Sequence, residues 1–270
     1  MNFKEQLSKI TGIPKEELPT GYQMIGDIVI LQLKNGNEEK IAKAVSEIIP
    51  NAKTVCVKTG EITGEYREPS IKKIWGNSTE TTHHEHDCLF TFDVTKIMWA
   101  KGNMNERKRI ASQPKKGENI LDMFAGIGYF SIPLAKHNPT CQVLSIEKNP
   151  NAIHYLKKNA EINKLKNITI KEGDSMTDTP NKWADRIIMG YIPEPIGFLK
   201  SAFKALKDKG VIHYEGVRNT GEEESLFLPV KEEGIKQGYE CKLLHTQTVK
   251  SYGPKRWHIV VDVECIKKNE

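Results

Sequence analysis

The hydrophobic and polar positions follow one pattern in the first third of the chain and another in the rest. In the first third, short runs of β-branched and other apolar residues alternate with polar stretches, as at residues 28–33 and 52–59. Such runs predict strands, whereas the apolar spacing over residues 38–49 predicts a helix with one buried face. We therefore expect residues 1–86 to form a small α+β domain with an antiparallel sheet.

Further along the chain, strand-like runs alternate with helical ones. Helical spacing of apolar residues is clearest over 150–163 and 195–207. This alternation predicts an α/β domain over residues 87–270, built on a doubly wound, mainly parallel sheet. The runs 241–249 and 257–265 flank a short loop, so we expect the sheet to end in an antiparallel hairpin. The predicted parallel strands are residues 118–124, 142–148, 168–174, 185–191 and 210–216.

Composition and charge narrow the class of protein without identifying a function. The chain has 270 residues, of which 28% are charged and 38% hydrophobic, which excludes collagen-like, low-complexity and wholly disordered proteins. The formal charge of +5 is compatible with a nucleic-acid partner but too small to demonstrate one. The five cysteines form no CxxC pair, and no apolar stretch has the roughly 20 residues that a membrane span needs. We expect a cytoplasmic protein that does not enter membranes.

The strongest chemical signal is the sequence DMFAGIGYF, residues 122–130. Two glycines follow a predicted strand and precede a predicted helix, where glycine lets the backbone approach a ligand closely. The motif is not a dinucleotide fingerprint, because Ser131 stands at the third glycine position, and it lacks the Lys-Ser/Thr ending of a Walker loop. Its acid, Asp122, would repel a pyrophosphate but can accept hydrogen bonds from an amino-acid moiety, directly or through water. The predicted ligand contacts in this motif are Asp122, Phe124, Ala125, Gly126 and Gly128.

Two further carboxylates support a cofactor site at the strand ends. Glu147 closes the next predicted strand, where α/β cofactor folds place an acid on ribose hydroxyls. The third strand ends in Gly173-Asp174-Ser175, where a carboxylate can accept the exocyclic amine of an adenine. Each acid alone is ambiguous, since strand ends often carry acids as helix caps. Together with the glycine turn, they predict a site for S-adenosylmethionine that includes Glu147, Asp174 and Ser175.

Several blocks of the chain resemble a known enzyme family. The blocks are FDVTKIMWAKGNMNERKRIA (92–111), DMFAGIGYFSIPLAKH, IEKNP, DRIIMGY and GVIHYEG, together with GEITGEYREP (60–69) and VKSYGPKRWHIVVDV (249–263). They are similar to the archaeal wybutosine-synthesis tRNA aminocarboxypropyl transferases, which are close kin of the tRNA guanine-37 N1-methyltransferases. The resemblance covers most of the chain and implies a class I methyltransferase-like, Rossmann-like fold and a tRNA partner, contacted at its anticodon region.

Two positions distinguish the two relatives. In the methyltransferases, the fourth strand usually ends in an Asn-Leu-Pro motif that contacts the target guanine, whereas Met189-Gly190-Tyr191 stands here, as is typical of the aminocarboxypropyl branch. Gly102 replaces an arginine of the methyltransferases. The resemblance therefore implies transfer of the 3-amino-3-carboxypropyl group to 4-demethylwyosine at position 37 of tRNA-Phe, with Gly190 in the cofactor site. Guanine-37 N1-methylation is the nearest alternative, and a catalytically silent RNA-binding module is a more distant one.

The orientation of the cofactor decides which carbon on its sulfonium is transferred. The resemblance places Ala100 and Arg107 at the methionine moiety, with Arg107 on the carboxylate through charge-assisted hydrogen bonds. The family often has a hydroxyl side chain at position 100, so contact at Ala100 must be apolar or through the backbone. Glu106 matches the residue proposed as general base in the methyltransferases. The alternative is that Glu106 pairs with Arg109 or Arg107 along a helix.

Basic and aromatic residues are interleaved near the C-terminus, a mixture that suits phosphates and unstacked bases. The alternative is a solvated loop with Trp257 in the core. The predicted RNA contacts are Lys250, Tyr252, Lys255 and Arg256. In the sequence HHEHDC at 83–88, the histidines, acids and cysteine are too close together in sequence for a usual zinc site. We therefore predict a polar interdomain loop and no metal. Nothing in the sequence indicates an oligomeric state.

Overall fold

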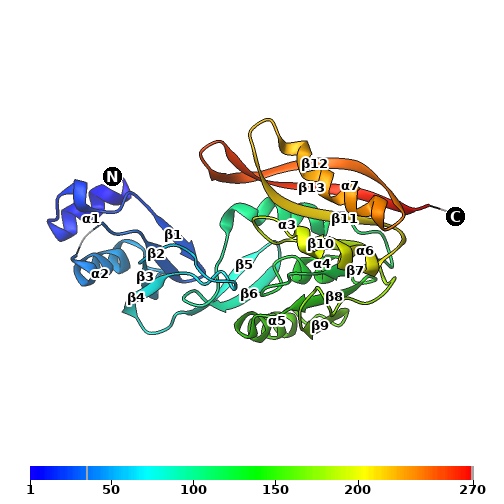
Figure 1. Ribbon diagram of the computed structural model, residues 1–270. Helices are drawn as coiled ribbons and strands as arrows, with labels where there is room; N and C mark the ends of the chain where they lie inside the picture. The colour runs from blue at the N-terminus through cyan, green and yellow to red at the C-terminus, as the bar shows by residue number, and fades with distance from the viewer. Residues whose placement is uncertain (35, 269–270) are drawn as a thin grey trace. The chain divides into compact units, whose positions relative to one another are not determined.

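The computed structural model describes residues 1–34 and 36–268, which belong to two compact units, Met1–Trp99 and Ala100–Glu270 (Figure 1). The elements of the first unit are α1 (Phe3–Thr11), η1 (Lys15–Glu17), β1 (Tyr22–Ile25), β2 (Ile28–Leu31), α2 (Glu38–Ile48), β3 (Thr54–Lys58), β4 (Ile71–Gly76), β5 (Glu80–Glu85) and β6 (Cys88–Asp93). The predicted helix over 38–49 and strands at 28–33 and 52–59 correspond to α2, β2 and β3. The first unit is therefore α+β, as the sequence predicts.

The sheet of the first unit has the order β1-β2-β3-β4 and is mixed rather than antiparallel. β2 and β3 run parallel, while the two outer pairs are antiparallel. The expectation of an antiparallel sheet was wrong for this central pair, because α2 forms a crossover that returns the chain in the same direction. Val29 and Val55 in the sheet pack with Leu7 of α1 and with Ile41 and Val45 of α2 in one buried cluster.

The β5–β6 hairpin belongs to the first unit. Its turn is formed by His86 and Asp87, whose φ angles of 49° and 61° lie in the left-handed region. We predict from the sequence that the second domain begins at residue 87, but the pairing of 80–85 with 88–93 keeps both strands in one unit. Trp99 closes this unit with its ring 5.2 Å from the parallel ring of Phe92.

The second unit contains a seven-stranded sheet of order β12-β13-β11-β10-β7-β8-β9. The pairs from β11 to β9 are parallel, whereas β13 and β12 are antiparallel, which confirms the mainly parallel sheet and the terminal hairpin. The elements are η2 (Lys101–Asn103), α3 (Met104–Ala111), β7 (Asn119–Asp122), α4 (Ser131–His137), β8 (Gln142–Glu147), α5 (Pro150–Ile162), β9 (Ile168–Glu172), β10 (Ala184–Met189), η3 (Ile196–Phe198), α6 (Leu199–Ala205), β11 (Leu206–Asn219), η4 (Glu223–Leu226), α7 (Phe227–Lys236), β12 (Tyr239–Gly253) and β13 (Arg256–Lys267).

Consecutive apolar residues in the central strands point to opposite faces, and helices cover both. Ile120 of β7 packs in the cluster with Ile110 of α3 and Leu134 of α4, whereas its neighbour Leu121 packs in the cluster with Phe203 of α6. The sheet is therefore doubly wound. Within the described ranges, no helix has the length and apolar character required to cross a bilayer.

The strand order reverses between β7 and β10. From β7 the chain proceeds outward through β8 and β9, whereas β10 and β11 lie on the other side. In open α/β sheets, ligands bind outside the carboxyl ends of the strands at such a switch point. We therefore expect the loops that follow β7, β8 and β10 to form the ligand site.

Candidate functional site

The loop after β7 is a tight turn that requires glycine at two positions. Gly126 and Gly128 have φ angles of 55° and 95°, which side chains with a Cβ rarely adopt. A Cβ on Gly128 would lie only 2.4 Å from Cγ1 of Ile132 and 2.8 Å from Cδ1 of Leu156. The amide of Ala125 donates to the carbonyl of Ile146 at 3.1 Å, which ties the turn to β8. The predicted glycine turn is present, and the helix that follows it, α4, begins at Ser131.

Asp122 lies beneath this turn with no exposed surface. Its Oδ2 accepts from Ser131 Oγ at 2.6 Å and its Oδ1 from the Phe124 amide at 3.3 Å. Burial raises the pKa of Asp122 to about 7, against the hydrogen bonds from Ser131 and Phe124, which lower it. In this structure the carboxyl braces the turn from inside, and its contact with a ligand stays a prediction.

Glu147 at the end of β8 is held by backbone amides. Its Oε2 accepts from the amide of Gly126 at 2.7 Å, and its Oε1 accepts from the amides of Lys148 and Asn149 at 2.9 and 2.7 Å. A carboxylate offers about four lone pairs, so Oε2 can accept a further donor. The side chain is only partly buried. Glu147 is therefore fixed in orientation and still able to bind a hydroxyl.

Asp174 follows β9 on the next loop. Its Oδ1 accepts from the Met176 amide at 2.8 Å, and its Oδ2 lies 3.7 Å from Lys148 Nζ. With 40% of its side chain exposed, it can accept from a ligand. Ser175 is buried and donates to the carbonyl of Met123 at 2.5 Å. The serine thus joins the β9 loop to the end of β7, and its predicted cofactor contact stays a prediction.

Aromatic rings surround the loop after β10. Phe124 lies 5.2 Å from Tyr191 and 4.8 Å edge-to-face from Phe198, measured between ring centroids. A Cβ on Gly190 would lie 3.1 Å from Cε2 of Phe130. Phe124 and Gly190 are among the residues predicted from the sequence, whereas Phe198 and Phe130 are not. Their apolar spacing is the same as that of ordinary core residues, so it does not mark them as part of a site.

Glu106 and Arg107 are both buried on α3. Arg107 Nη1 donates to the carbonyl of Ala100 at 3.3 Å, which joins the helix to the loop before it. Both oxygens of Glu106 accept from Arg109, at 2.8 and 2.6 Å. Burial raises the pKa of Glu106, while the hydrogen bonds and charge of Arg109 lower it. The structure therefore shows the Glu106–Arg109 pair that was the alternative interpretation, and the general-base role stays a prediction.

Arg109 continues this pair into the sheet. Its Nη1 and Nη2 donate to Asp262 of β13 at 2.5 and 3.0 Å, and Asp262 lies 2.6 Å from Nδ1 of His213 on β11. Nε2 of His213 is 2.7 Å from Nη1 of Arg186, and a guanidinium only donates. His213 therefore accepts at Nε2 and donates from Nδ1 to Asp262. Burial lowers the pKa of His213, consistent with a neutral ring.

A second buried pair joins β11 and β13 and was missed by the sequence analysis. Glu215 and His258 have 3% and 1% of their surface exposed, and Oε2 of Glu215 lies 2.9 Å from Nε2 of His258. Nearby in the sequence, Arg218 forms two hydrogen bonds with Glu194, at 2.8 and 3.0 Å, and Glu194 also accepts from Tyr214 at 3.0 Å. A usable signal existed, because polar residues at alternate positions in a central strand need buried partners.

The predicted RNA contacts lie on the β12–β13 hairpin, which Figure 1 draws in orange and red. The guanidinium of Arg256 lies 5.5 Å from the ring centroid of Tyr252, and Lys255 adopts a left-handed φ of 54° at the turn. A Cβ on Gly102 would lie 2.7 Å from Cδ of Lys250, so Lys250 lies over the η2 turn. The hairpin is thus adjacent to the segment that begins at Ala100. Contact with RNA stays a prediction.

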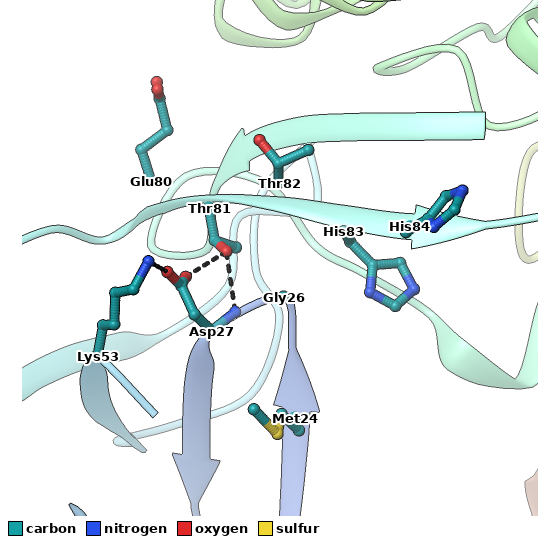
Figure 2. A pocket seen from close by; sticks show the side chains of 9 residues that line it. All are labelled: Met24, Gly26, Asp27, Lys53, Glu80, Thr81, Thr82, His83 and His84. Carbon is teal, nitrogen blue, oxygen red and sulfur yellow. Dashed lines mark hydrogen bonds and ion pairs between the residues drawn. The ribbon is translucent and has the colours of Figure 1, made fainter. Parts of the chain in front are cut away.

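The first unit contains a separate hollow of about 750 Å³ (Figure 2). Its lining residues are Met24, Gly26, Asp27, Lys53, Glu80, Thr81, Thr82, His83 and His84. The Asp27 carboxylate accepts from Thr81 Oγ1 at 2.6 Å and lies 3.1 Å from Lys53 Nζ (Figure 2). These contacts fix the β1–β2 turn against β5. Among the described residues, no group of three or more His, Cys, Asp or Glu side chains could hold a metal ion.

Comparisons with known proteins bear on the whole chain. The family model of the TRM5/TYW2 methyltransferase domain matches residues 81–240, and that of the TYW2 N-terminal domain matches residues 3–79. A tRNA(Phe) (4-demethylwyosine(37)-C(7)) aminocarboxypropyltransferase of Methanocaldococcus jannaschii is 43% identical over 90% of this chain and 97% of that protein. A tRNA (guanine(37)-N(1))-methyltransferase Trm5b of Pyrococcus abyssi is 35% identical over 94% of this chain and 78% of that protein.

A solved structure agrees with these matches. The crystal structure of M. jannaschii TYW2 in complex with AdoMet has a TM-score of 0.76 and 37% identity, covering 92% of this chain and 100% of that one. The fold described above is thus shared with a structure that is also similar in sequence. The resemblance found in the sequence blocks is confirmed, and the chain belongs to the TRM5/TYW2 family.

Proposed function

We propose that this chain transfers the 3-amino-3-carboxypropyl group of S-adenosylmethionine to C7 of 4-demethylwyosine at position 37 of tRNA(Phe). The observation that carries the proposal is the 43% identity to a transferase of that activity, over 90% of this chain and 97% of the relative. The Met189-Gly190-Tyr191 motif at the end of β10 agrees with it. Guanine-37 N1-methylation is the second candidate, since the P. abyssi methyltransferase is 35% identical.

The strand ends fit S-adenosylmethionine. The cofactor, when bound, supplies a sulfonium that activates each of its three attached carbons. Glu147 is held by three backbone amides and retains capacity for ribose hydroxyls. Asp174 has an exposed carboxylate for an exocyclic amine. Gly126 and Gly128 keep the intervening turn free of side chains, so the backbone there can lie against the ligand.

The segment from Ala100 to Arg107, which contains η2 and the first turn of α3, is the part of the chain that we assign to orienting the transferred group. Arg107 is buried and bonded to the Ala100 carbonyl, so its guanidinium is positioned before any ligand arrives. A guanidinium forms strong charge-assisted hydrogen bonds with a carboxylate. By fixing the carboxylate of the aminocarboxypropyl group, Arg107 would determine which carbon faces the acceptor, and a positioned reactant accounts for much of the rate in such transfers.

The tRNA partner is proposed to lie along the β12–β13 hairpin with its anticodon region at the strand ends. Tyr252 is 40% exposed beside Arg256, a pair suited to an unstacked base and a phosphate. Lys250 lies over Gly102, so a nucleotide bound by the hairpin is adjacent to the segment Ala100–Arg107. This arrangement supports placement of nucleotide 37 of the tRNA at the cofactor site.

The test uses S-adenosylmethionine labelled separately in its methyl and carboxyl carbons, with two matched tRNAs. One carries 4-demethylwyosine at position 37 and the other an unmodified guanine. We expect the carboxyl label to enter the first tRNA only, and the methyl label to leave as methylthioadenosine. Methyl label in the guanine-bearing tRNA would instead establish the methyltransferase. Incorporation of neither label into either tRNA would favour a silent RNA-binding module.

A further inference from the structure

Glu215, on the carboxyl-terminal half of β11, has one carboxylate oxygen engaged and one available. Oε2 is 2.9 Å from His258 Nε2, whereas Oε1 has no hydrogen-bond partner among the residues that the structure describes. The side chain is 3% exposed. A Cβ built on Gly190 would lie 3.6 Å from Oε1, so this oxygen faces the loop after β10. Oε1 is therefore free to accept a hydrogen bond, and it lies where a ligand at the loop after β10 would meet it.

His258 fixes the orientation of this carboxylate. Because a carboxylate only accepts, Nε2 of His258 carries the hydrogen and donates to Oε2. The register pairs His258 with Val217 of β11, two residues beyond Glu215, so both side chains lie on the same face of the sheet. Nδ1 of His258 is buried without a partner in the described part of the chain. The histidine therefore serves Glu215 alone, within the second unit.

In the two neighbouring acids, Glu106 and Asp122, every carboxylate oxygen already accepts a hydrogen bond. Both oxygens of Glu106 bind Arg109, and both oxygens of Asp122 accept from Ser131 and the Phe124 amide. Burial is the main cause of the raised pKa values of Glu106 and Asp122, and the charge of Glu215 adds to both. The three acids therefore lie near one another, and among them only Glu215 has an oxygen that accepts no hydrogen bond within the described part of the chain.

We propose that Glu215 accepts the proton displaced from the target carbon and that His258 is its positioning residue. This inference rests on the proposed function. C7 of the base bonds to the γ-carbon of the aminocarboxypropyl group while the carbon–sulfur bond breaks, and that electron pair remains on sulfur as a thioether. The C7–H bonding pair then returns to the ring, and the proton passes to Oε1. A positive charge thus moves from sulfur to the base and is removed with the proton.

The first test compares Glu215→Gln with Glu240→Gln, an exposed residue of β12, in single turnovers on tRNA bearing 4-demethylwyosine. We expect Glu215→Gln to slow transfer by about 10²–10⁴-fold, the usual contribution of general acid–base catalysis, with tRNA and cofactor affinities little changed. Deuterium at C7 should slow this variant more than the wild type, because proton removal becomes rate-limiting. The control should match the wild type.

The second test examines His258. His258→Gln keeps an N–H donor toward Glu215, whereas His258→Leu removes it. We expect the leucine variant to lose kcat with little change in KM, and the glutamine variant to recover most of that loss. If Glu215→Gln does not fold, Glu215→Asp, which keeps the carboxylate at a shorter reach, takes its place in the isotope measurement.

The outcomes separate this inference from the proposed function. If wild-type protein transfers no carboxyl label, the proposed function is wrong and the inference falls with it. If the wild type transfers and Glu215→Gln is equally fast with no added isotope effect, only the inference is wrong. A larger isotope effect in Glu106→Gln than in Glu215→Gln would assign the proton transfer to Glu106 and overturn the proposal.

Discussion

Asp122 shows how one residue can link the glycine turn to the pH dependence of stability. The carboxyl has no exposed surface, and burial raises its pKa from the ordinary 3.8 to about 7. A raised pKa means that the folded chain holds this proton more tightly than the unfolded chain. Its contribution to stability is therefore complete below pH 3.8 and is lost as pH rises through about 7, by about 4 kcal/mol in all.

Asp122→Asn should remove this pH dependence. Between pH 5 and pH 8 the free energy of unfolding of the variant should rise relative to the wild type by about 2–3 kcal/mol, because the wild type loses stability over that range and the amide does not titrate. Urea unfolding at the two pH values measures the difference. The matched control is Asp208→Asn, at a carboxylate that is 69% exposed. The free energy of unfolding of this control should change between the two pH values by the same amount as that of the wild type. If the free energy of unfolding of Asp122→Asn changed with pH as much as that of the wild type, burial would not raise the pKa of Asp122 as described.

Gly128 offers a test of why the turn needs glycine. Gly128→Ala places a Cβ at a φ of 95° and 2.4 Å from Ile132 Cγ1, so both backbone strain and overlap oppose it. Gly221 has a φ of 89° with open space around it, so Gly221→Ala incurs the strain alone. We expect the Gly221 variant to lose about 1 kcal/mol and the Gly128 variant about 1–3 kcal/mol more. Thermal unfolding measures both, and equal losses would mean that the overlap is relieved cheaply.

At the level of elements, α3 is held to the sheet by charge as well as by apolar packing. Arg109 binds Glu106 on its own helix and Asp262 on β13, and Asp262 also accepts from His213. Burial raises the pKa of Asp262, but the hydrogen bonds from His213 and Arg109 outweigh it and hold that pKa below its usual range. The helix that carries Arg107 is thereby fixed to the strands that carry Glu215 and His258.

Asp262→Ala should be strongly destabilising, because it leaves the partly buried Arg109 without one of its two carboxylates and the buried His213 without its acceptor. Removing one member of a buried ionic pair costs about 3–5 kcal/mol. Asp208→Ala removes an exposed partner of Lys182 and should cost less than about 1 kcal/mol. Chemical unfolding of the two variants gives the comparison, and a loss for Asp262→Ala as small as that for Asp208→Ala would show that Arg109 and His213 find other partners.

These elements also show what the sequence could and could not predict. The helices and parallel strands follow from local spacing, and the glycine turn from residues adjacent in sequence. The Arg109–Asp262 contact joins positions 153 residues apart, and periodicity contains no information about which distant strand lies opposite α3. The parallel β2–β3 pair was missed because strand direction depends on the crossover. Glu215 was missed because its partner His258 lies 43 residues away on a strand that local spacing does not place beside β11.

For the whole molecule, the formal charge of +5 matters less than where the charged groups lie. Asp122 and Glu147 are held at strand ends inside the second unit, whereas Lys255 and Arg256 are exposed at the tip of the β12–β13 hairpin. Acidic side chains inside the unit lower the net charge of the protein. They do not weaken the positive electrostatic field that a polyanion meets at the hairpin. A small net charge is therefore consistent with binding to tRNA.

The double variant Lys255→Ala, Arg256→Ala should weaken tRNA binding and reduce its salt dependence. Each lost phosphate contact lowers the slope of log affinity against log salt by about 0.7–0.9, so we expect a reduction of about 1.4–1.8. The matched control is Lys231→Ala, Lys236→Ala on α7, the helix that packs near Cys241 at the opposite end of β12, and the net charge changes equally. Filter binding across a salt series measures both slopes. The overall charge is the same in the two double variants. An equal loss of slope in both would therefore mean that tRNA binding depends on the total charge of the protein. A loss of slope only in Lys255→Ala, Arg256→Ala would place the phosphate contacts on the hairpin.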